Sequence, residues 1–239
     1  MSAPLRTAWG RVAVHLLPAR CFVCEERLPA LQHLGSCARC WSRLAAARGP
    51  SCPRCALPLG AGGGACARCA ARPFPFEAVT AAVLYDDIAR RFLLRAKVSK
   101  RPELLEPFGR QLAAAVRASG IARGVDAIVE VPSDPWTRLL RGFDPAEGIA
   151  RALSRDIDVG IAPRRLRRRL RLTGAAKSMS AAARWRATRR AFVARGAVGG
   201  TVLLVDDVLT TGATASACAL ALHDAGASTV RLAIWARTL

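Results

Sequence analysis

The pattern of apolar and polar positions divides the chain into two parts that meet near residue 75. From Phe76 onward, short apolar runs alternate with helix-like stretches. Residues 202–205 form a fully apolar run after two glycines, which is typical of a buried parallel strand. Residues 125–131 predict a second strand, which ends at Pro132.

Helices are predicted beside these strands. Residues 145–153 are helix-like, and the Ala-rich residues 215–225 predict a helix that ends at Gly226. The pattern indicates an α/β fold with a mainly parallel sheet and helices on both faces. We expect a lead segment at 1–18, a cysteine-rich module at 19–72, and an α/β domain at 76–239 that is long enough to bury its own core.

Eight of the nine cysteines lie in four C-x-x-C pairs, separated by 12, 11 and 10 residues. Two thiolates at this spacing can bind one tetrahedral ion, so two pairs complete a Cys₄ zinc site. The simplest arrangement joins the first pair to the second and the third to the fourth, whereas a crossed arrangement also fits the spacing. The predicted ligands are Cys21, Cys24, Cys37, Cys40, Cys52, Cys55, Cys66 and Cys69.

The cysteine-rich module is expected to depend on metal for its folding, because a short segment with so few apolar residues buries little core. Four protein ligands close each site, which predicts two structural Zn²⁺ ions. Incidental or redox cysteines are the alternative, and the regular spacing disfavours it. Arg39, Arg54 and Arg68 lie inside three of the pairs, where they could contact nucleic acid, face solvent or dock another protein.

An acidic pair and a hydroxyl-rich turn follow the apolar run at 202–205. The turn and the start of the next helix direct backbone N–H groups at a phosphate, and Gly212 lets the backbone approach closely. The two carboxylates suit the hydroxyls of a ribose and can support Mg²⁺ bound to pyrophosphate. Cys218 is predicted to be a core residue. The candidate sugar-phosphate ligands are Val205, Asp206, Asp207, Thr210, Thr211, Gly212, Ala213 and Thr214.

Residues 132–144 are predicted to form a loop after the second strand. This loop carries Ser133, Arg138 and Arg141. Guanidinium groups pair with phosphate in a bidentate way, so Arg138 is a candidate for neutralising a pyrophosphate. The alternative is that these arginines are ordinary surface residues.

The loop at 202–214 resembles the ribose-phosphate loop of type I phosphoribosyltransferases, and the chain as a whole resembles the ComF (GntX-like) family of competence-associated proteins. The resemblance also rests on residues 17–21, on the stretch from Tyr85 to Lys97, and on residues 131–143. It implies a double zinc ribbon and a phosphoribosyltransferase domain that binds phosphoribosyl pyrophosphate or a nucleotide, with Mg²⁺. It also implies a link to DNA uptake or nucleotide metabolism, with single-stranded DNA and DNA-processing proteins as the expected partners. It also implies that residues 132–138, including Ser133, hold pyrophosphate, that Asp206 and Asp207 hold ribose, and that residues 210–214 hold the 5′-phosphate.

Three positions depart from the family pattern. Ala176, Ala183 and Ala187 stand where Gln, Glu and Asn are expected, in the region of the flexible loop that closes over substrates in catalytic relatives. The candidate catalytic residues are Asp206, Asp207, Arg138 and Lys177. No general base is evident and the acceptor is not defined, so the sequence supports ligand binding more strongly than turnover.

The net charge of +20 has a local source, because residues 159–205 contain twelve basic residues and no acidic one. This basic block could face solvent, steer a polyanionic substrate, or bind single-stranded DNA with a tryptophan stacked on a base. The candidate nucleic-acid contacts are Arg167, Arg168, Arg169, Arg171, Arg184, Trp185, Arg186 and Arg189.

No stretch reaches the roughly 18 apolar residues that span a bilayer, and residues 12–17 are too short and too interrupted for a signal peptide. We therefore expect a cytoplasmic protein with reduced thiols. Two hypotheses follow from the sequence. The first is an enzyme or former enzyme of phosphoribosyl transfer, and the second is a non-catalytic nucleic-acid-associated factor in DNA uptake or processing.

Overall fold

A computed structural model of the protein describes residues 20–28, 35–44, 46–47, 49–60, 64–71, 74–98, 102–169 and 191–239. Its centre is a sheet of four parallel strands in the order β1-β6-β5-β2. The strands are β1 (Val79–Leu84), β2 (Ala127–Glu130), β5 (Thr201–Leu209) and β6 (Thr229–Arg237). The predicted mainly parallel sheet is thereby confirmed.

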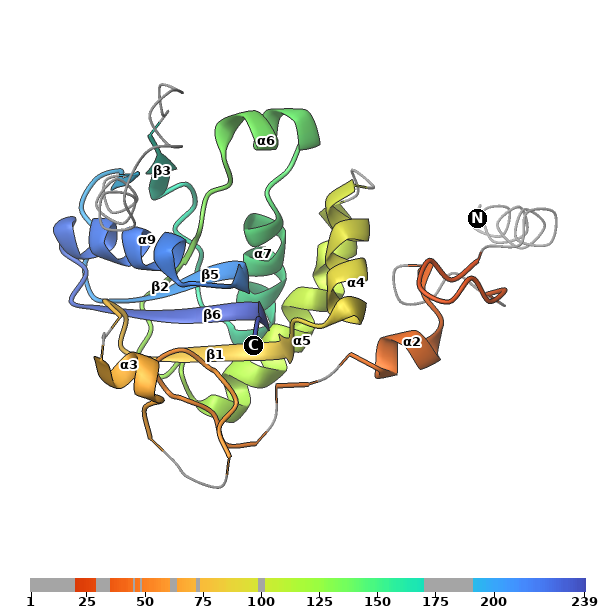
Figure 1. Ribbon diagram of the computed structural model, residues 1–239. Coiled ribbons are helices and arrows are strands. Elements are labelled where there is room, and N and C mark those ends of the chain that lie inside the picture. The colour runs from red at the N-terminus through yellow and green to blue at the C-terminus, as the bar shows by residue number, and fades with distance from the viewer. Residues whose placement is uncertain are drawn as a thin grey trace, which may run out of the picture.

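Helices cover both faces of the sheet, as predicted (Figure 1). One face packs on α4, α5 and α7, and the other on α9. Between α4 and α5 runs a short 3₁₀ turn, η2 (Pro102–Leu105). The helices are α4 (Asp87–Val98), α5 (Glu106–Ser119), α7 (Pro145–Ile157) and α9 (Ala213–Asp224). Each of them lies within the described residues, where no helix is both long and apolar enough to cross a membrane.

Contacts in the core on one face of the sheet position α5 and α7. The Trp235 ring of β6 stacks on Phe108 of α5 with ring centroids 4.1 Å apart, and its Nε1 donates to Gln111 Oε1 at 2.9 Å. Gly109 lets α7 approach α5 closely, because a Cβ there would meet the Ile149 carbonyl oxygen at 2.7 Å. Asp144 caps the N-terminus of α7 by accepting a hydrogen bond from the Ala146 N–H.

Two predicted boundaries differ from the structure. Strand β5 continues past Asp206 and Asp207 to Leu209, because β6 pairs with it along its whole length, up to the pair Leu209 and Arg237. The segment predicted as a loop at 132–144 contains a helix, α6 (Pro135–Arg141). Asp134 caps α6 by accepting from the Trp136 and Thr137 N–H groups, and Gly142 ends it in the left-handed conformation. The loop prediction was therefore wrong over α6.

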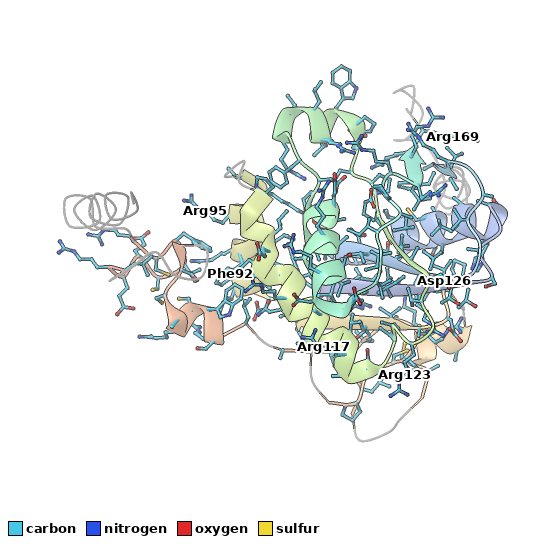
Figure 2. The ribbon with its side chains drawn as sticks, turned by 180° about the vertical axis from the view of Figure 1, so that it is seen from behind. Phe92, Arg95, Arg117, Arg123, Asp126 and Arg169 are labelled. Atoms are coloured by element: carbon cyan, nitrogen blue, oxygen red, sulfur yellow. The ribbon has the colours of Figure 1, made fainter. Side chains whose placement is uncertain are left out.

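The cysteine-rich module consists of two ribbons, the first with Cys21–Cys40 and the second with Cys52–Cys69, and they contact different parts of the α/β domain. The first ribbon, which contains α2 (Ala38–Ser42), contacts α4, where Phe22 and Trp41 pack edge-on against Phe92. Figure 2 shows Phe92 and Arg95 on the side of α4 that faces this ribbon. The second ribbon, which contains α3 (Ala67–Ala71), lies beside β1 and β6.

Non-strand segments lie along both outer strands of the sheet. In the linker between the ribbons, Ala46 forms an antiparallel bridge with Val83 of β1, and the Ala47 N–H donates to the Ala82 carbonyl at 3.0 Å. Ile161 forms a parallel bridge with Ile128 of β2. The chain then continues into a two-stranded antiparallel sheet of β3 (Leu166–Arg168) and β4 (Phe192–Ala194).

Candidate functional site

The acidic pair lies near the end of β5 and receives a cation from another element. Lys97 of α4 places its Nζ 2.6 Å from Asp207 Oδ2, and the Asp207 N–H donates to Asp206 Oδ1 at 2.8 Å. Burial, together with the neighbouring Asp207 carboxylate, raises the pKa of Asp206 well above its usual range. A ligand that brings hydroxyl donors or positive charge to Asp206 would therefore stabilise its ionised carboxylate.

The turn after β5 presents backbone N–H groups at the start of α9. Gly212 is the N-cap of α9 and has a φ of 79°, in the left-handed region that favours glycine. Within the described part of the chain, no group accepts a hydrogen bond from the N–H of Thr210, Thr211 or Gly212. Thr210, Thr211 and Thr214 are exposed. This turn can bind an anion through N–H groups and hydroxyls, with the N-terminus of α9 behind them.

The arginine assigned to pyrophosphate is bound to an acid elsewhere. Arg138 of α6 places its Nη2 3.1 Å from Glu147 Oε2 on α7, and no contact joins it to the acidic pair. Ser133 donates its N–H to Asp144 Oδ2 at 2.7 Å. Burial raises the pKa of Asp144, although this hydrogen bond opposes the shift. Asp144 thus fixes the loop that carries Ser133 to the N-terminus of α7.

The eight predicted cysteine ligands gather into two groups of four, in which the sulfur atoms all lie within 4.8 Å of one another. The groups follow the simpler of the two predicted arrangements and contain Cys21, Cys24, Cys37 and Cys40, and Cys52, Cys55, Cys66 and Cys69.

The spacing of the sulfur atoms matches zinc coordination. The Sγ atoms of Cys24 and Cys37 are 3.7 Å apart, and those of Cys55 and Cys66 are 3.8 Å apart. A tetrahedron with Zn–S bonds of about 2.3 Å has edges of about 3.8 Å. Both groups therefore fit a structural Zn²⁺ ion.

The part of the basic block within the described residues lies on and beside β3. Arg168 places its guanidinium 5.7 Å from the centre of the Phe192 ring, while Arg167 and Arg169 are exposed. Cys218 is fully buried, as predicted for a core residue. Several predicted residues fall outside the described ranges, namely Arg171, Ala176, Lys177, Ala183, Arg184, Trp185, Arg186, Ala187 and Arg189.

Three residues near the turn were not predicted as members of the site. Lys97 carried a signal, since it ends the stretch from Tyr85 that resembles the family. Arg68 of α3 was noted only as a residue inside a cysteine pair, yet its Nη2 donates to the Thr211 carbonyl at 2.9 Å. Arg237 is buried and donates to the Leu209 carbonyl at 3.0 Å. No local pattern marks Arg237, because its partners are distant in sequence.

Comparisons with known proteins cover both parts of the chain. Residues 12–70 match the family described as double zinc ribbon domain. Over 229 residues the chain is 31% identical to the DNA utilization protein YhgH of Salmonella typhi, covering 93% of this chain and 99% of that protein. The DNA utilization protein YhgH of Escherichia coli K12 is 31% identical over 227 residues, with the same coverage.

Proposed function

Since this chain belongs to the ComF (GntX-like) family of proteins with an N-terminal double zinc ribbon, we propose that it binds phosphoribosyl pyrophosphate, or a related ribose phosphate, with Mg²⁺ and acts in the utilisation of DNA. The relatives that carry the name DNA utilization protein motivate the second half of this proposal. The first half rests on one arrangement, which is the acidic pair of β5 followed directly by a turn whose N–H groups at 210–212 have no acceptor among the described residues.

Each half of a ribose phosphate has a matching group in this arrangement. Asp206 and Asp207 can accept hydrogen bonds from the 2′- and 3′-hydroxyls, and the N–H groups at 210–212 can donate to the 5′-phosphate. Lys97 forms an ion pair with Asp207 and so places a cation beside the acidic pair. The ligand lies outside the carboxyl ends of parallel strands, which is where open α/β sheets bind ligands.

Magnesium and the arginine of α6 complete this proposal. Carboxylate oxygens are hard donors, so Asp206 and Asp207 would help to hold a Mg²⁺ ion that arrives with pyrophosphate, and the ion would neutralise phosphate charge. Arg138 is joined to Glu147 through Nη2 in a partly exposed ion pair, so turning its guanidinium toward a pyrophosphate would cost little free energy. Alanines stand at 176, 183 and 187, where the family resemblance leads us to expect Gln, Glu and Asn, so we propose ligand binding as the function and leave transfer to a test of acceptors.

Calorimetric titration of the zinc-loaded protein with phosphoribosyl pyrophosphate and Mg²⁺ tests the proposal. We expect micromolar binding that is lost in the Asp206→Asn/Asp207→Asn variant. The matched control is Asp156→Asn/Asp158→Asn, which removes the same charge from exposed positions at the end of α7. If the folded wild type does not bind, or if both double variants bind as the wild type does, the proposed ribose-phosphate site is wrong.

Direct binding of single-stranded DNA is the second candidate function. Arg167 and Arg169 are exposed on and beside β3, within the block of residues 159–205 that has no acid to compensate its charge. Cations that contact phosphates make affinity fall with salt, by a slope of about 0.7 per phosphate on a single strand.

Fluorescence anisotropy at several salt concentrations measures this slope. Arg167→Gln/Arg169→Gln should reduce it by about 1.4 if each arginine contacts one phosphate. Arg117→Gln/Arg123→Gln serves as the control, since Figure 2 shows both residues at the opposite end of the domain from Arg169. Equal slopes for the two variants would remove β3 from any DNA interface.

A further inference from the structure

The turn that follows β5 is held from behind by two arginines, one of which belongs to the second ribbon. Arg237 Nη1 donates to the carbonyls of Leu209 and Thr210 at 3.0 and 3.3 Å. Arg68 Nη2 donates to the next carbonyl, that of Thr211, at 2.9 Å. Three consecutive peptide carbonyls are therefore engaged by guanidinium groups.

The orientation of these carbonyls fixes the orientation of the N–H groups on the other side. A trans peptide unit is planar, and its C=O and N–H bonds point in opposite directions. The carbonyls of Leu209, Thr210 and Thr211 share their peptide units with the N–H groups of Thr210, Thr211 and Gly212. Holding the oxygens toward the arginines therefore directs these three N–H groups away from them, and two positive charges polarise the units in the sense that favours an anion.

Arg237 connects the turn to the backbone of the second ribbon. Its side chain is 3% exposed, and its Nε donates to the carbonyl of Cys55, a predicted zinc ligand, at 2.7 Å. Within the described chain this guanidinium forms no ion pair, so backbone carbonyls and the Thr238 hydroxyl satisfy it. A buried charge without an acidic partner depends on such carbonyl groups, because an unsatisfied donor costs the desolvation free energy of the group.

The second ribbon reaches the same turn through Phe74. Arg54, which lies between Cys52 and Cys55, donates from Nη2 to the Phe74 carbonyl at 2.9 Å. The Phe74 ring lies against Gly212, where a Cβ would meet its Cε1 at 2.6 Å. The second ribbon is thus joined to the turn by the Phe74 ring, by the Arg68 guanidinium and, through Arg237, by the Cys55 carbonyl.

From these contacts we propose that the second zinc ribbon positions the phosphate-binding turn, with Arg68 and Arg237 as positioning residues that act through the carbonyls of residues 209–211. This inference rests on the proposed function, because it assigns the ribbon to the ribose-phosphate site. The first ribbon does not share this role, since its described contacts to the α/β domain are with α4 and α5.

The chain offers a matched pair of variants for the test. Arg68 and Arg39 occupy the same place in two C-A-R-C motifs, and both are exposed, but only Arg68 contacts the turn. Isothermal titration with ribose 5-phosphate should show affinity about tenfold weaker for Arg68→Ala, the loss of one charge-assisted hydrogen bond. Arg39→Ala should bind as the wild type does. Zinc content and the thermal midpoint should stay unchanged in both variants.

Two further measurements separate positioning from general stability. Arg68→Lys should recover part of the affinity, because an ammonium group can also donate to the Thr211 carbonyl. In amide NMR spectra without ligand, Arg68→Ala should shift the signals of Thr211 and Gly212, and Arg39→Ala should not. If Arg68→Ala and Arg39→Ala bind equally while the wild type binds, the positioning role is wrong and the proposed function stands. If the folded wild type binds neither ribose 5-phosphate nor phosphoribosyl pyrophosphate with Mg²⁺, both proposals fall.

Discussion

Substituting Gly212 with alanine tests whether the second ribbon packs on the phosphate-binding turn. Gly212 has a φ of 79°, and a Cβ at this position would lie 2.6 Å from Cε1 and 2.9 Å from Cζ of Phe74. The substitution therefore meets two separate penalties, one in the backbone and one against a neighbouring ring.

The two penalties have known sizes. A non-glycine residue in the left-handed region costs roughly 1–2 kcal/mol. An extra methyl group in a packed contact typically costs a further 1–3 kcal/mol, because the ring must move. Gly212→Ala should thus reduce the free energy of unfolding by roughly 2–5 kcal/mol. It should also weaken ribose 5-phosphate binding, because the peptide unit that carries the Gly212 N–H must shift.

Gly142 provides the control for the backbone penalty. It has a φ of 85°, and a Cβ there has nothing within 4 Å, so Gly142→Ala should cost only roughly 1–2 kcal/mol. Urea unfolding of the zinc-loaded variants measures both free energies. In a Phe74→Ala background, the excess cost at Gly212 should disappear, and the double-mutant cycle should give a coupling of roughly 1–3 kcal/mol. Equal costs at the two glycines, or no coupling to Phe74, would refute the packing of the second ribbon on this turn.

Three other substitutions or treatments give independent predictions. Gly109→Ala should destabilise the fold by roughly 1–3 kcal/mol in urea unfolding, because its Cβ would press on the Ile149 carbonyl of α7, and an unchanged midpoint would contradict the close approach of α5 and α7. Burial raises the pKa of Glu130, so ionisation of this carboxyl opposes folding. Glu130→Gln should have the same thermal midpoint as the wild type below the ordinary glutamate pKa and a higher midpoint than the wild type as pH rises. A difference in midpoint that does not change with pH would refute this. A chromogenic zinc assay should give two ions per chain and one after Cys66→Ser, whereas one ion in the wild type would exclude the second site.

The parts of the fold that could be predicted are those whose cause is local. Residues 202–205 are apolar on both faces, and the structure places them in β5 between two strands. Strand β1 was not singled out, because its Val79–Leu84 sequence contains two alanines, which have little preference for strands. Helix α6 has a start signal in Asp134 and Pro135 and a stop signal in Gly142, but it buries no residue, so no apolar face marked it.

The candidate site also has a part that could be predicted from local sequence and a part that could not. The acidic pair and the turn are contiguous in sequence, and their order alone predicts what they can bind. Lys97 and Arg68 come to them from segments that precede β5 by more than a hundred positions, and Arg237 reaches Cys55 across 182 positions. Such contacts depend on the order of strands in the sheet, and single-sequence patterns carry no information about that order.

The linker between the ribbons has a consequence for solubility. A four-stranded parallel sheet has two open edges, and exposed edges recruit strands from other molecules. Here Ala46 and Ala47 cover β1, and Ile161 covers β2. The cover on β1 is anchored at each end by a cysteine group, so loss of zinc would release it and expose the Val79–Leu84 edge. Zinc bound at the two cysteine groups would thereby protect a surface that neither ion touches, and chains without zinc should associate through β1 before the α/β domain itself unfolds.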